Sequence, residues 1–180
     1  MTQFDDRPAI DDNALKAQVD AEIAERLMVE AEDARHIHRR AFRIGGLALL
    51  VALDATSEIA EVPTLYRLPG APHGVRGLVN RHGRVIPVLD LSELLPLQNS
   101  TATNPWLLVC GRGDAAVGLM IDSLPERKTF SQSDEVTLAQ LDNPMTPYAQ
   151  AAYQQGKDIW LDIDVETFFT KVFKTEMSIA

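Results

Sequence analysis

Four aspartates stand beside apolar runs, where paired carboxylates could act as general acid and general base. They are Asp54, Asp90, Asp122 and Asp164. At the end of an apolar strand, however, an aspartate more often accepts hydrogen bonds from the first amides of a turn or helix. We therefore predict that these carboxylates cap elements of structure and that the protein is not an enzyme.

Other kinds of chemistry find less support in the sequence. It has no nucleophile motif, and Gly111-Arg112-Gly113 is too short for a dinucleotide fingerprint, because no third glycine opens a helix. His36 and His38 would point apart on a helix, and no Cys, Asp or Glu completes a zinc spacing around them. We expect no cofactor and no metal ion.

The composition also restricts the class of protein. With 180 residues and 46% hydrophobic content, the chain can bury the core of one domain or of two small ones. Its net charge of -9 argues against nucleic acid or an anionic membrane as the main partner. The single cysteine, Cys110, cannot form an internal disulfide and is typical of a reducing cytosol.

Export and membrane insertion are not indicated either. The first dozen residues are acidic and contain no apolar core, unlike a signal peptide. No apolar run reaches the ~18 residues that a membrane-spanning helix needs. These observations predict a cytoplasmic protein.

A basic segment interrupts this acidic chain. Residues 62–89 contain no acidic residue, but they include Arg67, Arg76, Arg81 and Arg84, together with His73 and His82. Such an island favours a surface that contacts a partner. The alternative is an ordinary solvated loop face.

The stretch that must position these side chains contains two short apolar runs. Residues 75–79 and 85–91 are predicted strands, and the polar segment 80–83 between them predicts a tight turn. Pro87 cannot donate a hydrogen bond, so the second strand is expected to be an edge strand or to carry a bulge. Residues 90–95 then predict one capped helical turn.

The same stretch resembles the signature of the CheW-like domain, a family of adaptors that couple bacterial chemoreceptors to a histidine kinase. The resemblance is carried by Val75-Arg76-Gly77-Leu78-Val79-Asn80, by Gly83 and by Val85-Ile86-Pro87-Val88-Leu89-Asp90-Leu91. It implies that Asp90 caps the turn before Leu94. The family usually has Asn-Leu-Arg-Gly at the hairpin turn, whereas this chain has Asn80-Arg81-His82-Gly83.

The resemblance implies a fold and a division of the chain. CheW-like domains consist of two small five-stranded β-barrels around a shared core, so we expect a mainly β protein with an additional N-terminal helix. The expected parts are a helical extension at residues 1–39, a CheW-like domain at 40–172 and a tail at 173–180. The length, the extension and Trp160 in the last strand resemble PilI-type adaptors of twitching-motility systems. The choice between a flagellar and a pilus pathway stays open.

The resemblance also implies partners and a place in the cell. A CheW-like adaptor is non-catalytic and bridges the cytoplasmic tip of a methyl-accepting chemoreceptor and the regulatory domain of a CheA-type kinase, at receptor arrays. The residues that we expect to bind partners are Glu58, Arg76, Gly77, Asn80, Arg81, His82, Gly83 and Arg84. For the two glycines, the alternative is a purely conformational role.

One pair of these residues departs from the family pattern. Counted from Gly77, His82 stands where the family has arginine, and Glu58 matches a glutamate that resembles that arginine's partner. We therefore expect Glu58 and His82 to lie close together. The alternative is that Arg81 takes over through a local shift of the turn and that His82 faces solvent.

The segments outside this hairpin follow two different periods. Leu15, Val19, Ile23 and Leu27 recur at four-residue spacing, which predicts a helix over 12–38 whose basic end suits the helix dipole. This helix could dock on the β core or bind a partner. Alternating or continuous apolar runs then predict strands over 41–44, 47–53, 57–62, 65–68, 106–110, 116–121, 127–130 and 159–165, with a helix over 166–173.

The two halves of the chain resemble each other. Asp54 precedes Asp122 by 68 residues and Asp90 precedes Asp164 by 74, and each follows a hairpin-like segment. This periodicity favours two stacked β units of similar design, with the polar segment 99–105 as the connection between them.

A different function class would use the same basic residues. A small β-barrel module can bind single-stranded nucleic acid through a basic groove with stacking aromatic residues. Here the groove would contain Arg67, Arg76, Arg81 and Arg84, but Tyr66 is its only aromatic residue and the net charge opposes such binding.

Overall fold

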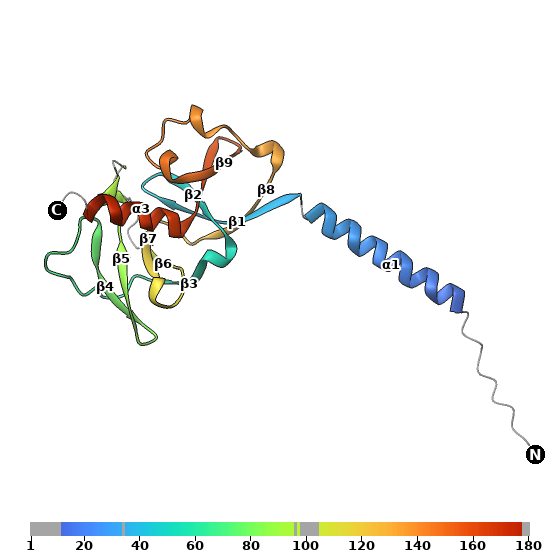
Figure 1. Cartoon of the computed structure of the whole chain (residues 1–180), viewed down its shortest axis with the longest axis horizontal. Helices are drawn as coiled ribbons and strands as arrows, with labels where there is room; N and C mark the ends of the chain where they lie inside the picture. The colour runs from blue at the N-terminus through green and yellow to red at the C-terminus, as the bar shows by residue number, and fades with distance from the viewer. Residues whose placement is uncertain (1–11, 34, 96, 98–104, 178–180) are drawn as a thin grey trace, which may run out of the picture. The chain divides into compact units, whose positions relative to one another are not determined.

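The computed structural model describes residues 12–33, 35–95, 97 and 105–177. Contacts divide the chain into two units, Met1–His36 and Ile37–Ala180. The β strands form the second unit, and the first contains the helix α1 (Figure 1).

Helix α1 spans Asp12–Asp33 and carries exposed apolar side chains. Val19, Ile23 and Leu27, which belong to the four-residue stripe, are all exposed. Across the part of the chain that the structure describes, neither this helix nor any other combines the length and apolar character required to cross a membrane.

The C-terminal end of α1 differs from the prediction. The helix was expected to reach residue 38, but it ends at Asp33, and residues 36–40 belong to strand β1 (His36–Ile44). The basic residues therefore lie on a strand and not at the negative end of a helix dipole. The pairing of β1 with β2 (Leu47–Val51) begins at Arg40, so sheet formation overrides the local helical pattern.

Ten strands form two five-stranded sheets. The first sheet has the order β8 (Glu126–Ser131), β1, β2, β10 (Asp158–Ile163) and β9 (Ala149–Gln155). The second has the order β3 (Thr56–Glu61), β6 (Trp106–Cys110), β7 (Val117–Ile121), β5 (Arg84–Leu89) and β4 (Val75–Arg81). Each sheet contains a parallel pair, β2 with β10 in the first and β5 with β7 in the second. The mainly β fold with two five-stranded units is thus confirmed.

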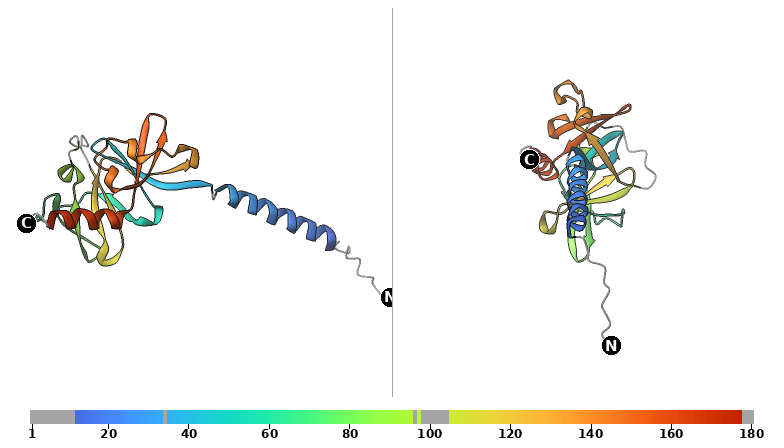
Figure 2. Two further views of the ribbon diagram at one scale, coloured as in Figure 1. Left: turned by 45° about the horizontal axis from the view of Figure 1, so that its top comes forward. Right: turned by 90° about the vertical axis from the view of Figure 1, so that its right-hand side faces the viewer.

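The two sheets exchange hairpins between the halves of the chain. The first hairpin, β1–β2, pairs with strands of the second half, and the β6–β7 hairpin pairs with strands of the first half. Figures 1 and 2 show the cyan β1–β2 ribbon beside the orange C-terminal strands, and the yellow β6 and β7 beside the green β4 and β5. The predicted similarity of the halves is present, but each sheet combines both halves.

This exchange corrects the predicted role of residues 99–105. Most of that segment lies outside the described residues, yet β5 before it and β6 after it belong to the same sheet. The segment therefore connects strands within one sheet rather than two units. Strand β9 was not predicted at all, because its sequence of Ala and Gln around Tyr153 lacks the β-branched residues that mark strands.

Three apolar clusters fill the second unit. The largest joins both sheets and the helix α3 (Val165–Met177), and its centre includes Leu49, Leu89, Leu119 and Phe168. A second cluster around Phe130 and Tyr153 fills the first sheet, and a third around Val79, Ile86 and Val109 fills the second sheet. The family resemblance implied this arrangement, in which a shared apolar core lies between the smaller cores of the two sheets.

Three of the four aspartates serve as caps or connectors, whereas Asp54 lies within the 3-10 helix Leu53–Ala55, which has no side-chain cap. Asp90 accepts a hydrogen bond from the amide of Ser92 (3.0 Å) and caps α2 (Leu91–Leu94). Asp164 accepts one from the amide of Thr167 (2.7 Å) in the first turn of α3. These contacts confirm that Asp90 and Asp164 terminate elements. Asp122 accepts a hydrogen bond from the amide of Gly45 (2.7 Å), which ties the end of β7 to the β1–β2 turn in the other sheet.

Pro87 lies on a strand that is not an edge. Strand β5 has β7 on one side and β4 on the other, so the edge alternative is wrong. The bulge alternative is not met by β5 either, because the register shift between Val75 and Gly77 places the extra residue, Arg76, on β4. The pairing of β5 with β7 begins at Val88, one residue after the proline.

Candidate partner-binding site

The β4–β5 hairpin closes with a two-residue turn. Arg81 pairs with Arg84, and the residues between them, His82 and Gly83, have φ values of 51° and 80°. Positive φ at both central positions is the conformation of a type I′ turn, which matches the twist of the strands. The side-chain oxygen of Asn80 accepts a hydrogen bond from the amide of Gly83 (3.0 Å). Asn80 and Gly83 therefore fix the turn that presents their neighbours.

Glu58 contacts both of its predicted alternative partners, Arg81 and His82. Its Oε1 forms an ion pair with Nη2 of Arg81, while its Oε2 lies 3.4 Å from Nε2 of His82. The side chain of His82 is 79% exposed, against 26% for Arg81 and 23% for Glu58. Arg81 is thus the principal partner, and His82 lies at the solvent side of the same carboxylate.

A hollow of about 600 Å³ opens beside this ion pair. Its charged rim consists of Glu58, Arg81, His82, Arg84 and Arg112, and its apolar floor consists of Ile86, Val109 and Ala116. We call this feature the basic hollow. It gathers four of the residues predicted to bind partners and adds Arg112, which precedes the 3-10 turn Gly113–Ala115.

In the sequence, Arg112 is notable only as the middle residue of Gly111-Arg112-Gly113. It lies 28 residues after Arg84 in the chain, and its place beside β5 depends on the hairpin exchange that brings β6 and β7 into this sheet. No local pattern could have indicated that proximity.

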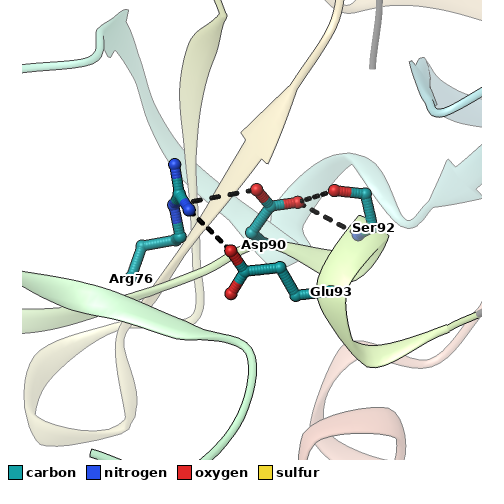
Figure 3. Close-up of polar contacts among 4 residues, drawn as sticks. All are labelled: Arg76, Asp90, Ser92 and Glu93. Atoms are coloured by element: carbon teal, nitrogen blue, oxygen red, sulfur yellow. Dashed lines mark hydrogen bonds and ion pairs between the residues drawn. The ribbon is translucent and has the colours of Figure 1, made fainter. Parts of the chain in front are cut away.

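Arg76 lies at the opposite end of β4 from the turn of the hairpin. Figure 3 shows its side chain directed toward Asp90 and Glu93. Its Nη1 contacts Oε1 of Glu93 at 2.5 Å, and its Nε lies 3.8 Å from Oδ2 of Asp90. Arg81 lies five positions further along the strand, a span of roughly 16 Å. The structure therefore does not bring Arg76 together with the other predicted site residues.

Gly77 makes the closest backbone approach in this region. Tyr66 and Leu78 exchange two backbone hydrogen bonds of 2.8 Å each, which lays the segment before β4 against that strand. A Cβ on Gly77 would lie 2.7 Å from the carbonyl oxygen of Tyr66, and Gly77 has a φ of 152°. This close backbone contact is sufficient to explain why a glycine stands at position 77. A contact between Gly77 and a partner protein is not needed to explain it.

Residues 41–173 match the sequence profile of the CheW-like domain. The chain belongs to this family. The match includes both sheets, the hairpin with the basic hollow and the first part of α3.

Two curated relatives are similar to parts of this CheW-like chain. Protein PilI of Pseudomonas aeruginosa is 31% identical over 88 residues, which is 46% of this chain and 47% of PilI. The chemotaxis protein CheW of Rhizobium meliloti is 30% identical over 95 residues, which is 52% of this chain and 61% of that protein. The chain thus spans about half to three-fifths of the length of these relatives.

A solved structure shares the fold. The scaffolding protein TtCheW from Thermoanaerobacter tengcongensis superposes with a TM-score of 0.63 at 14% identity, over 71% of this chain and 84% of TtCheW. This structural similarity agrees with the arrangement of two five-stranded sheets described above.

Metal chemistry was not expected at this CheW-like site. Among the residues with described positions, no group of three or more His, Cys, Asp or Glu side chains is placed to hold a metal ion. Cys110 is completely buried, and burial raises the pKa of its thiol to about 12. The chemistry that the site offers is ion pairing and hydrogen bonding by guanidinium groups.

Proposed function

We propose that this protein is a non-catalytic adaptor that couples chemoreceptors to a CheA-type histidine kinase in chemotaxis or twitching-motility signalling. The observation that carries the proposal is the match of residues 41–173 to the CheW-like domain. The similarity to PilI and CheW proteins supports the same pathway class. The proposed partners are the cytoplasmic tip of a methyl-accepting receptor and the regulatory domain of the kinase, at cytoplasmic receptor arrays.

The geometry supports a role in binding a partner protein rather than in catalysing a reaction. The aspartates that could have formed a catalytic set are distributed over several element ends, where Asp90 and Asp164 accept backbone hydrogen bonds. The charged groups of the basic hollow lie instead on an open surface that another protein could cover. We assign partner binding to Glu58, Arg81, His82 and Arg84 around that hollow, whereas Arg76 would contribute through a separate surface with Glu93.

The proposed mechanism is mechanical coupling through two interfaces. Because Asp122 hydrogen-bonds to Gly45 across the two sheets and a single apolar cluster joins them, a displacement at one sheet is transmitted to the other. Such a connected body could relay a change at the receptor to the kinase without a reaction of its own.

The test is reconstitution with the full chain. Receptor-containing membranes and a CheA-type kinase from the same source would be mixed with the protein, and kinase autophosphorylation and co-sedimentation would be measured. We expect the protein to bring the kinase to the membranes and to make its activity depend on the receptor. A protein that binds neither component would contradict the proposal.

The site assignment needs a variant pair. Arg81→Glu should weaken kinase or receptor binding, and Arg127→Glu is the matched control because Arg127 is an exposed arginine on β8 in the other sheet. Equal binding by both variants, each with a wild-type melting temperature, would leave the adaptor role intact and contradict the assignment of the hollow.

A further inference from the structure

Two guanidinium groups at the basic hollow lack an internal partner. The guanidinium groups of Arg84 and Arg112 make no hydrogen bond or ion pair with any residue that the structure describes. Both side chains are exposed, in a protein whose net charge is -9. By contrast, Arg76 and Arg81 are paired with carboxylates of the same chain.

A third donor at the hollow is also unsatisfied. The Nε of Arg81 is buried and has no hydrogen-bond partner among the residues with described positions, although the Nη2 of the same side chain contacts Glu58. A buried donor without an acceptor costs free energy, so the hollow holds one more donor than its own acceptors satisfy. The rim of the hollow contains one carboxylate, that of Glu58, and the guanidinium groups of Arg81, Arg84 and Arg112. Hydrogen-bond donors therefore exceed acceptors at this rim.

We propose that the basic hollow binds an acidic segment of a partner protein, with Arg84 and Arg112 as the residues that select its carboxylates. The inference rests on the proposed adaptor function for the identity of the partner and adds the chemistry of the segment. Arginine presents a planar set of donors that matches a carboxylate in two-point contacts. Apolar side chains between the carboxylates would meet the floor at Ile86 and Ala116.

A protein segment fits this hollow better than nucleic acid does. Modules that bind single strands place aromatic rings under successive bases, and no aromatic side chain lines the hollow. The chain as a whole would also repel a polyanion over distances beyond the hollow. A short segment with few carboxylates avoids most of that repulsion.

The experiment measures binding of a defined probe to the full chain. The probe is a fluorescein-labelled peptide rich in Glu and Leu, and its counterpart has Gln in place of every Glu. Fluorescence anisotropy at low salt should detect binding of the acidic peptide, and the Gln peptide should bind at least about tenfold more weakly. Added salt should weaken binding of the acidic peptide.

Three variants locate the contact. Arg84→Glu and Arg112→Glu should each weaken binding of the acidic peptide by about tenfold or more, and Arg127→Glu should leave it within about twofold. Equal binding of the two peptides, or equal binding by the wild type and both hollow variants, would overturn the inference. Tighter binding of a single-stranded oligonucleotide than of the peptide, lost in the same variants, would also overturn it.

A parallel measurement separates this inference from the adaptor proposal. If kinase or receptor binds the wild type and the hollow variants equally, and the acidic peptide does not bind, the inference fails while the adaptor function stands. If the peptide binds through Arg84 and Arg112 but neither kinase nor receptor does, the chemistry of the hollow stands and the adaptor function fails.

Discussion

Glu58 on β3 and Arg81 on β4 form an ion pair between the two edge strands of one sheet. Strands β6, β7 and β5 lie between them in the sheet, so β3 and β4 are not neighbours in the strand order. The ion pair therefore links the two edges of the sheet through side chains. The other sheet has a comparable link, because Lys128 on β8 donates a hydrogen bond to Gln155 on β9 (3.2 Å).

The first prediction concerns the energy of the Glu58–Arg81 pair. A double-mutant cycle with Glu58→Gln and Arg81→Gln should give a coupling free energy of about 1 kcal/mol, because the pair is only partly shielded from water. Urea unfolding of the four proteins measures it. His82→Gln is the control and should couple less strongly to Glu58, since His82 is largely exposed. A larger coupling for His82 than for Arg81 would reverse the assignment.

The second prediction concerns Gly77. Gly77→Ala should destabilise the fold by about 2 kcal/mol or more, because the new Cβ would collide with the Tyr66 carbonyl, and Gly77→Asp should be worse. Gly83→Ala is the matched control: it also has positive φ, but nothing lies within 4 Å of its Cβ, so about 1 kcal/mol is expected. Thermal unfolding compares the two. Equal losses would show that the segment before β4 moves aside freely.

The third prediction is a pH dependence that arises from Asp162. Its side chain is 1% exposed and accepts hydrogen bonds from Arg39 Nε (2.9 Å) and Gln150 (3.2 Å). Burial raises the pKa of Asp162 above 3.8 in spite of Arg39, and Asp164 raises it further. Between the unfolded and the raised folded pKa, the folded protein holds a proton that the unfolded chain has released. Stability from this group therefore falls as pH rises through that window.

Asp162→Asn should remove this part of the pH dependence, which urea unfolding at several pH values above about 4 measures. Asp164→Asn is the contrasting control. Hydrogen bonds from the Thr167 hydroxyl and amide lower the pKa of Asp164, so its contribution is present above 3.8 and is lost as pH falls through the lowered value. An unchanged slope in the Asp162 variant would contradict the prediction.

The fourth prediction uses the single cysteine. Because Cys110 is completely buried and its thiol has a pKa of about 12, a disulfide reagent should react with it only when the protein opens. The reaction rate in native buffer should be far below the rate in urea. Fast labelling of the folded protein, at the rate of an exposed thiol, would show that the core around β6 opens readily.

The fifth prediction concerns the N-terminal unit. Removal of residues 1–33 should change the melting temperature by no more than about 3 °C, because β1 begins at His36 and the apolar clusters lie in the second unit. A start at Arg39 should cost more, because it removes His38, whose Nδ1 lies 2.9 Å from the Thr129 hydroxyl on β8. A large loss on removal of residues 1–33 would show that α1 supports the sheets.

The sequence predicts those elements whose apolar pattern is strong. The β4–β5 and β6–β7 hairpins and the Asp90 cap follow directly from alternation and turn residues. Strand β9 and the end of α1 do not, because the partners that stabilise them are far away in the chain: β9 pairs with β10, and residues near Arg40 pair with β2. The position of Arg112 at the basic hollow could not be predicted for the same reason. It depends on the long-range pairing of β7 with β5, which local sequence patterns do not indicate.

The exchanged hairpins have a consequence for the order of synthesis. Strands β1 and β2 leave the ribosome before the other strands, but their neighbours β8 and β10 come from the last third of the chain. Until β10 has emerged, the apolar residues of β2 have no parallel strand beside them and remain available to chaperones and to other nascent chains. The first sheet can therefore be completed only after β10 has been synthesised, and a truncated product that stops before β10 would release a hairpin without its sheet.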